Sequence, residues 1–298
     1  MMAALTSEEV RTYRDDGYVV PSYRVPEGKM AVLSAAVEEV IAANAGTRPE
    51  QLPNVHITNG AGTHLKGHPA FLDIALDEGL LDLVSCVIGD DIVMWGCQVF
   101  CKPGSDGMEV PMHQDGQYWP IRPLATCTVW LAVDDSDRGN GCLTVIPGSH
   151  RDRVHFRHRT RTDDDIVLNQ AVDDSRAFDR PPAFVERARG QLSMHDIFLI
   201  HGSAPNTSGR RRAGVAIRYM PTTSWFRRDL EMQFSGYPSN FSDRPIWLAR
   251  GRDVCGKNDF TIGHSTPRPR RAAPRPHRSP GSSGRMFAPP GAGTGIPA

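Results

Sequence analysis

The chain has 298 residues, and its 34 Lys and Arg residues are balanced by 34 Asp and Glu residues, so the formal net charge is zero. This balance argues against a dedicated nucleic-acid-binding protein, which normally carries a basic excess. Hydrophobic residues make up 39% and charged residues 23%, which is typical of a soluble globular protein. No apolar run approaches the roughly 18 residues that a membrane-spanning helix needs.

The termini and the cysteines indicate a cytoplasmic protein with a disordered tail. The N-terminus lacks the basic and apolar segments of a secretory signal. The six cysteines are scattered without a Cys-x-x-Cys motif, which favours reduced thiols. Residues 265–298 are rich in Pro, Gly and Arg and contain no acidic residue, which predicts a disordered basic tail. The folded domain is therefore expected to span residues 1–264.

Helices are expected first along the chain. Thr6 and Glu9 form the pattern of a capping box, and Gly17 suits the end of that helix. A short strand is expected at 18–20, and a second helix after Pro26. Residues 71–88 read as helical in two pieces around Gly79.

From residue 91 onward, short apolar and β-branched runs bounded by Gly, Pro, Asn and Asp predict strands. They cover residues 92–95, 98–100, 126–133, 142–146, 191–194, 197–200 and 213–220. Strands and helices do not alternate, so we expect a mainly β fold with flanking helices around an antiparallel barrel or jelly roll. Residues 157–182 interrupt this series of strands, because they are rich in Arg and Asp and poor in apolar residues. They are predicted to form an insertion, either a lid or a solvated loop.

A His-x-Asp motif, His113-Gln114-Asp115, carries the first candidate ligands. Residues two apart in an extended chain project to the same side. His201, far downstream, is the third candidate, and His195 is a rival for that role. Two imidazoles and one carboxylate form the facial triad that holds Fe(II) and leaves positions open for a co-substrate and oxygen.

Further polar residues follow His201 at fixed positions. Arg212 opens a predicted strand eleven residues later, and Ser203 offers a hydroxyl nearby. A guanidinium is always charged and binds a carboxylate bidentately. Arg212 and Ser203 together therefore suit the far carboxylate of 2-oxoglutarate, whose keto-acid end would chelate iron.

Taken with the segments around them, these residues give the chain a clear resemblance to the phytanoyl-CoA dioxygenase family. The matching segments, in order and spacing, are Leu5-Thr6 with Asp16-Gly17-Tyr18-Val19-Val20, Lys102-Pro103-Gly104, His113-Gln114-Asp115, Thr128-Val129-Trp130-Leu131-Ala132, Asn140-Gly141-Cys142-Leu143 with Pro147-Gly148-Ser149-His150, and His201-Gly202-Ser203 with Asn206 and Arg212.

The resemblance implies a double-stranded β-helix (jelly-roll, cupin-like) core and an enzyme that uses Fe(II), 2-oxoglutarate and O2. It implies His113, Asp115 and His201 as iron ligands, with Arg212 and Ser203 on 2-oxoglutarate. Relatives that halogenate replace the ligand carboxylate with a small residue. Because Asp115 is retained, oxidation is favoured over halogenation.

Other residues are candidates for the rest of the site. Thr128 and Trp130 share one face of a strand, where they either line the 2-oxoglutarate pocket or pack in the core, and Gln98 is a weaker candidate for that pocket. Arg218 lies on the same side of its strand as Arg212 and is either a second inward-facing cation or part of an ion pair. Candidates for substrate contact directly follow the ligands: Gln117, Tyr118 and Trp119.

We therefore expect a dioxygenase that hydroxylates an unactivated C–H bond of a small molecule, such as a specialised-metabolite or antibiotic intermediate, releasing succinate and CO2. The same iron site could instead perform epoxidation, desaturation or cyclisation. Two other classes stay open: a non-catalytic jelly-roll binding protein, and a zinc hydrolase using the same ligands. No nucleic-acid or membrane partner is expected, a homo-oligomer is compatible with the sequence, and the substrate is left open.

Overall fold

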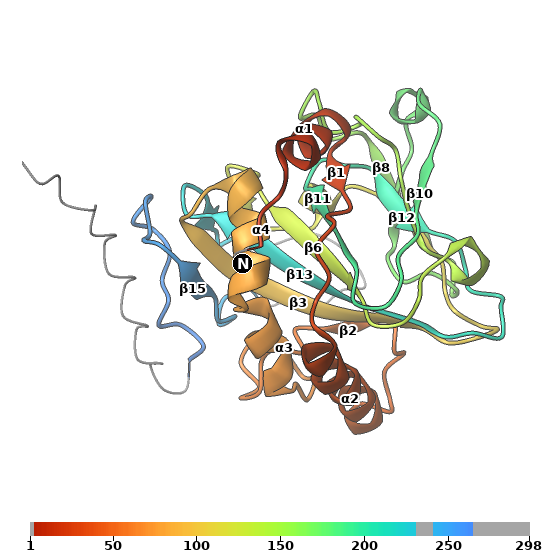
Figure 1. Ribbon diagram of the computed structural model, residues 1–298, viewed down its shortest axis with the longest axis horizontal. Helices are drawn as coiled ribbons and strands as arrows, with labels where there is room; N and C mark the ends of the chain where they lie inside the picture. Colours follow the sequence, from red (N-terminus) through yellow and green to blue (C-terminus); the bar gives the residue numbers. More distant parts are fainter. Residues whose placement is uncertain (1–2, 231–240, 265–298) are drawn as a thin grey trace, which may run out of the picture. The chain divides into compact units, whose positions relative to one another are not determined.

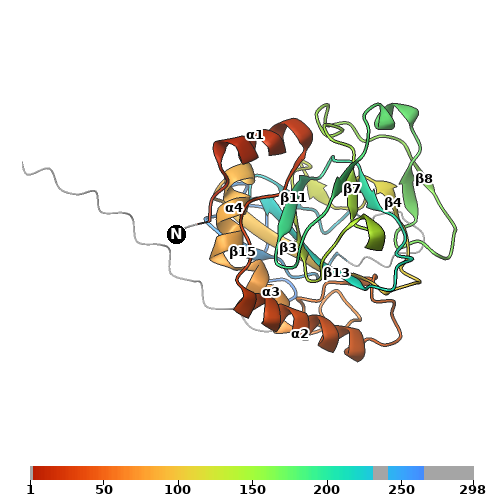
Figure 2. The same cartoon turned by 45° about the vertical axis from the view of Figure 1, so that its right-hand side comes forward.

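The computed structural model describes residues 3–230 and 241–264. Four helices, α1 to α4, precede most of the β structure and lie on one side of a large antiparallel sheet, with a smaller sheet on its other side (Figures 1 and 2). The helices in the described part are α1 (Ser7–Asp16), α2 (Glu27–Ala43), α3 (Pro69–Ala75) and α4 (Glu78–Ile88). This arrangement confirms the predicted jelly roll with flanking helices.

The two main sheets are antiparallel throughout. The larger has the order β1 (Tyr18–Val19), β11 (Leu192–Asp196), β6 (Cys127–Ala132), β13 (Arg212–Pro221), β3 (Ile92–Lys102) and β15 (Trp247–Arg250), with β2 (Leu52–Pro53) also pairing with β3. The smaller has the order β10 (Ala183–Val185), β7 (Leu143–Val145), β12 (His201–Ser203) and β4 (Val110–His113). Two short ribbons pair β14 (Trp225–Phe226) with β5 (Ile121–Arg122), and β8 (His158–Thr160) with β9 (Gln170–Val172).

The helix boundaries follow from capping residues. The predicted capping box at Thr6 and Glu9 is present, and Gly17 ends α1 in the left-handed conformation at φ 81°. The predicted break at Gly79 was wrong. The interruption falls at Leu76 and Asp77, because the Asp77 carboxylate accepts a hydrogen bond from the Gly79 amide at 3.1 Å and caps α4.

Two strand predictions also need correction. Residues 92–95 and 98–100 belong to one continuous strand, β3, in which Gly96 pairs with Arg218 where the register shifts. Residues 197–200 form a buried turn and not a strand. The Asp196 carboxylate accepts from the Phe198 amide at 2.9 Å and sets this turn, so β12 begins only at His201.

The larger sheet separates the core from a cavity. On one face, apolar residues of β3, β6, β11 and β13 pack against the helices, among them Val99, Leu131, Met194, Val215 and Ile217. Alternation along β13 turns Arg212, Ala216 and Arg218 to the other face, where they line a cavity between the sheets. The predicted sidedness of this strand is therefore confirmed.

The segment 157–182 contains a short ribbon and a 3₁₀ turn, η3 (Ser175–Phe178). Val172 and Ala177 pack against Ile146 and Ile200, which flank the smaller sheet. Leu168 reaches the cavity wall. The segment thus forms part of the fold beside the cavity, and its role as a lid stays a prediction.

No helix in the described ranges is long and apolar enough to cross a membrane. The predicted tail at 265–298, and with it the boundary at residue 264, lies outside the described residues.

Gly214 is required by the packing inside the cavity. A Cβ at this position would lie 2.0 Å from the Trp130 ring, and Trp130 stands on the neighbouring strand β6. We expect Gly214→Ala to lower the stability by about 1–3 kcal/mol, a usual cost of overpacking. Gly209→Ala is the control, because its Cβ would meet nothing within 4 Å. Thermal unfolding measures the effect, and equal melting temperatures for the two variants would contradict the packing account.

A buried lysine lies at the end of β3. Lys102 is 1% exposed and donates to the carbonyl oxygens of Ser203, at 3.3 Å, and Ala204. Burial, reinforced by the nearby Arg212 charge, lowers the pKa of Lys102 to about 6. Between this value and the ordinary lysine pKa, the unfolded chain binds a proton that the folded chain does not.

Stability should therefore rise with pH through that window, at up to about 1.4 kcal/mol per pH unit from this group. We expect Lys102→Met to flatten the dependence of the free energy of unfolding on pH above about pH 6. Exposed Lys66 provides the matched variant, Lys66→Met, which should keep the wild-type slope. Urea denaturation at several pH values measures both, and parallel curves for wild type and Lys102→Met would refute the buried neutral lysine.

Candidate metal centre and co-substrate pocket

Two histidines far apart in sequence face each other across the smaller sheet. His113 ends β4 and pairs in register with His201 at the start of β12, and the two ring centroids lie 4.3 Å apart. In each residue Nδ1 is held by a backbone carbonyl two residues earlier, Pro111 at 2.8 Å and Leu199 at 3.0 Å. These carbonyls accept a hydrogen bond from Nδ1–H, which selects the tautomer of the neutral imidazole whose Nε2 carries the lone pair.

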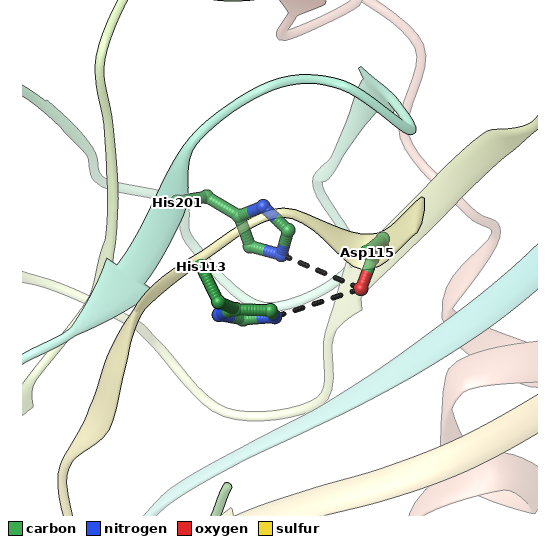
Figure 3. A group of neighbouring side chains, drawn as sticks. All are labelled: His113, Asp115 and His201. Carbon is green, nitrogen blue, oxygen red and sulfur yellow. Dashed lines mark ion pairs between the residues drawn. The ribbon is translucent and has the colours of Figure 1, made fainter. Parts of the chain in front are cut away.

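Asp115 completes the cluster (Figure 3). Its Oδ1 lies 3.5 Å from Nε2 of His113 and 3.9 Å from Nε2 of His201. The expected geometry was only partly right, because β4 ends at His113 and Asp115 opens a 3₁₀ turn, η1 (Asp115–Gln117). The turn, and not an extended chain, brings the carboxylate back to the imidazoles.

The three groups are buried, and burial together with the neighbouring charges sets the protonation states of His201 and Asp115. Burial and the neighbouring His113 lower the pKa of His201 well below its ordinary value, so its imidazole is neutral. Burial alone would raise the pKa of Asp115, but the adjacent histidines stabilise the anion and bring it well below the ordinary range. The cluster therefore presents a neutral imidazole at His201 and an anionic carboxylate at Asp115, with the His113 ring beside both.

This donor set suits a divalent metal. One ligand atom from each of His113, Asp115 and His201 lies within 4.8 Å of the others. Two imidazoles and a carboxylate on one side of an ion form the facial arrangement preferred by non-haem Fe(II), with the remaining positions open to the cavity. The residues present thus fit the iron that the sequence predicts.

His195, considered above as a rival ligand, lies beside the same carboxylate. Its Nε2 is 3.6 Å from Oδ2 of Asp115, and its ring centroid is 4.6 Å from that of His201. Thr128 pairs with His195 in register and donates its hydroxyl proton to the same Oδ2 at 3.4 Å. Oδ2 of Asp115 therefore faces Thr128 on β6 and His195 on β11, while Oδ1 faces His113 and His201.

Arg212 and Ser203 meet at another part of the cavity. The Arg212 guanidinium donates to the carbonyl of Gly141 at 2.9 Å and to the Ser203 hydroxyl at 3.4 Å. Its buried Nε has no hydrogen-bond partner within residues 3–230 and 241–264. Burial lowers its pKa to about 10, so it stays charged at neutral pH. Trp130 lies under this guanidinium, with 5.3 Å between Cζ and the ring centroid.

The other arginines of the run at 210–212 point elsewhere. Arg210 is paired with Asp137 at 2.9 Å, and Arg211 with Asp134 at 2.8 Å and with Glu38. Both are more exposed than the buried Arg212. Within this run, Arg212 alone lines the cavity.

The remaining predicted site residues distribute around one cavity with about 1250 Å³ of empty space, part of it open to solvent. Thr128, Trp130, Gln98, Tyr118, Trp119 and Arg218 line it. Gln117 sits half-buried in η1 and is not among the lining residues. Arg218 faces inward, as one of the two alternatives predicted, and donates to Gln98 at 3.1 Å.

Two residues near the site were not identified from the sequence. His158 belongs to the segment 157–182, which was expected to be a lid or a solvated loop, and its Nε2 accepts a hydrogen bond from the amide of Gln114, the residue between His113 and Asp115, at 3.1 Å. Arg187 is buried, and its Cζ lies 4.2 Å from the Trp130 ring centroid. Among the described residues, no carboxylate lies within ion-pair distance of Arg187. Nothing in the sequence pattern around Arg187 signals this position.

Comparisons with known proteins identify the family and the fold of the chain. A probable phytanoyl-CoA dioxygenase from Caenorhabditis elegans is 26% identical over 237 residues, which cover 72% of this chain and 75% of the relative. The solved non-heme monooxygenase ThoJ superposes with a TM-score of 0.63 at 21% identity, covering 83% and 85% of the two chains.

A second solved structure, EctD from S. alaskensis with 2-oxoglutarate and 5-hydroxyectoine, superposes with a TM-score of 0.61 at 19% identity, covering 88% and 87%. At these identities the structures establish the shared fold. The family model for phytanoyl-CoA dioxygenase matches residues 13–214, which include His113, Asp115, His201 and Arg212. The chain therefore belongs to the phytanoyl-CoA dioxygenase family, whose members are oxygenases dependent on Fe(II), 2-oxoglutarate and O2.

Proposed function

We propose that this protein hydroxylates a small molecule, with His113, Asp115 and His201 holding Fe(II). The observation that carries the proposal is the convergence of two free Nε2 atoms and one carboxylate oxygen at a single buried point that opens onto the cavity. When bound, the iron supplies the oxidising chemistry, with 2-oxoglutarate converted to succinate and CO2. Every other task falls to the residues of the chain.

The backbone carbonyls of Pro111 and Leu199 fix the tautomers of the two imidazoles, so that Nε2 of each is ready to bind metal without losing a proton. The Thr128 hydroxyl donates to the second oxygen of Asp115, and the His195 ring lies 3.6 Å from the same oxygen, which favours metal binding through the other oxygen only. These contacts leave positions on the metal free for the co-substrate and oxygen.

Arg212 and Ser203 are proposed to bind the far carboxylate of 2-oxoglutarate. The Arg212 side chain is buried and charged, and its Nε has no partner in the described part of the chain. A buried donor without a partner is costly, and a carboxylate ligand would remove that cost. Trp130 is placed to form the wall against which the co-substrate lies, while Thr128 and Gln98 border the pocket.

The substrate is proposed to bind beside Tyr118 and Trp119, which follow the ligands and line the cavity, with Gln117 at its margin. Because the ligand carboxylate is retained, hydroxylation is favoured over halogenation. Epoxidation, desaturation and cyclisation would use the same site, and the mass change of the product distinguishes them: a gain of one oxygen for hydroxylation or epoxidation, a loss of two hydrogens for desaturation or ring closure.

Removing either imidazole should abolish the reaction. We expect His113→Ala and His201→Ala to weaken Fe(II) binding at least about 100-fold, because each variant removes one of three ligands. Even the loss of a residue that only hydrogen-bonds to a ligand typically lowers metal affinity or activity by about 10–100-fold. Formation of succinate from 2-oxoglutarate should be lost in both. Anaerobic Fe(II) titration and succinate assay measure these two effects.

His64→Ala serves as the matched control, since His64 is exposed and lies outside the cavity. It should bind Fe(II) and form succinate like the wild type. Succinate formation at the wild-type rate in His113→Ala would remove this residue from the ligand set. Metal binding without any 2-oxoglutarate turnover in the wild type would favour the zinc-hydrolase or binding-protein alternative.

Removing the Arg212 clamp, the guanidinium proposed to bind the far carboxylate of 2-oxoglutarate, should weaken the binding of 2-oxoglutarate but not that of Fe(II). We expect Arg212→Ala to raise the KM for 2-oxoglutarate by about 100-fold, the scale of a lost charge-assisted bidentate contact, while Fe(II) affinity stays within about threefold. The matched variant Arg211→Ala removes an arginine that is paired outside the cavity and should leave this KM unchanged. Succinate formation over a range of 2-oxoglutarate concentrations measures both. An unaltered KM in Arg212→Ala would assign the clamp to another cation.

A further inference from the structure

A second group of buried donors lines the cavity away from Arg212. Arg244 is 7% exposed, Gln98 5% and Trp95 1%, and all three line the cavity. The Nε of Arg244, the Nε2 of Gln98 and the Nε1 of Trp95 are buried atoms without a hydrogen-bond partner among the described residues. Each of these atoms can only donate. Polar groups buried in this way are normally satisfied, so three such donors on one wall indicate a ligand that accepts hydrogen bonds.

The charge at this wall is positive. Arg244 has no carboxylate of the described residues within ion-pair distance, and Arg218 lies close enough to oppose its charge. Burial, together with the Arg218 and Arg228 charges, lowers the pKa of Arg244 to about 9, so it is still protonated at neutral pH. Burial and the charges of Arg244 and Arg218 lower the pKa of the buried His56 to about 3, so this ring is neutral. The neighbouring Asp243 acts on Arg244 only as a weaker counter-charge.

The walls around these donors are aromatic. Trp95 and Trp119 meet edge to face with centroids 4.6 Å apart, and Phe241 lies under the Arg244 guanidinium at 4.6 Å. All three rings line the cavity. Such a pocket combines flat apolar surfaces with one cationic wall, which suits a ligand with an apolar or aromatic body and one anionic group.

This wall cannot serve the same ligand group as the Arg212 clamp. Arg212 and Arg218 are six residues apart on one strand, so their Cα atoms are separated by about 20 Å. A five-carbon diacid bound at Arg212 is much shorter than that. Arg218 pairs in register with Thr128, whose hydroxyl contacts Asp115, so the second cationic wall adjoins the metal-binding carboxylate.

We propose that the cavity wall formed by Arg244, Arg218, Gln98 and Trp95 binds a carboxylate of the substrate, and that the substrate is an organic acid with an apolar or aromatic body. A guanidinium fork matches a planar carboxylate bidentately, and the desolvated setting strengthens the contact. This inference rests on the proposed function, because it places the acid beside the Fe(II) site. Arg218 and Arg244 lie beyond residues 13–214, where the family model matches.

The test compares acids with their neutral amides. Wild-type protein is loaded without oxygen with Fe(II) and saturating 2-oxoglutarate, so that the Arg212 end is occupied. Isothermal titration calorimetry then measures the binding of phenylacetate, indole-3-acetate, 4-phenylbutyrate and cinnamate, each against its amide. We expect at least one acid to bind ten times or more tightly than its amide. If no acid is preferred over its amide, the proposal is wrong.

Variants locate the preference. Arg244→Gln should lose the acid preference at least tenfold, Arg244→Lys should retain part of it because the charge stays but the fork is lost, and the exposed arginine variant Arg252→Gln should keep it fully. An acid preference that survives in a folded Arg244→Gln protein would overturn the assignment. If Arg244→Gln does not fold, the same comparison is made in Arg218→Gln.

The two proposals fail in different ways. Failure of wild-type protein to bind 2-oxoglutarate with Fe(II) would refute the proposed function, whereas the acid–amide comparison in metal-free protein would still report on the donor wall. Normal 2-oxoglutarate binding with no preference for any acid would refute only the proposal that the wall of Arg244, Arg218, Gln98 and Trp95 binds a substrate carboxylate.

Discussion

The pairing of β4 with β12 is the constraint on which the site depends. It sets His113 directly across from His201 although 87 residues separate them in the chain. A slip of one residue in either strand would turn one imidazole to the opposite face of the sheet. The carbonyls of Pro111 and Leu199 then fix both rings in one tautomer, and the 3₁₀ turn after β4 supplies the carboxylate. Fold and metal chemistry are thus joined through a single strand register.

Three arginines give the cavity its positive charge: Arg212 and Arg218 on β13 of the larger sheet, and Arg244 in the irregular segment before β15. In the described part of the chain, the buried arginines Arg187, Arg212 and Arg244 outnumber the buried carboxylates Asp115 and Glu50. Glu50 is already paired with Arg48 at 2.8 Å, and Asp115 is surrounded by histidines. Unpaired buried cations are expensive, so this imbalance makes sense when anions enter the cavity. The protein would then gain stability from the ligands it binds.

The part of the site that follows from period-two alternation or from a contiguous motif could be predicted from the sequence. Alternation placed Arg212 and Arg218 on one face of β13, and the His-x-Asp motif identified two of the three clustered residues. Arg211 and Arg212 are adjacent and chemically alike, yet they separate into an outer ion pair and an inner cation for the same reason.

The features of the site that could not be predicted from the sequence depend on contacts between residues far apart in the chain. The buried run at 197–200 has the composition of a strand, but the Asp196 side chain turns it. His195 was set aside because nothing after it continues the motif, and only the register of β11 with β6 brings it to Asp115. Arg244 lies in an irregular segment without periodicity, so its place in the cavity depends wholly on tertiary contacts.

The central claim is that one open metal site binds Fe(II) and 2-oxoglutarate together, and a visible spectrum without oxygen tests it most directly. Fe(II) and then 2-oxoglutarate are added to the metal-free protein. The account predicts a weak metal-to-ligand charge-transfer band that requires both additions, because the keto acid can chelate only at an open iron site. A folded protein that binds Fe(II) but gives no such band with 2-oxoglutarate would contradict it.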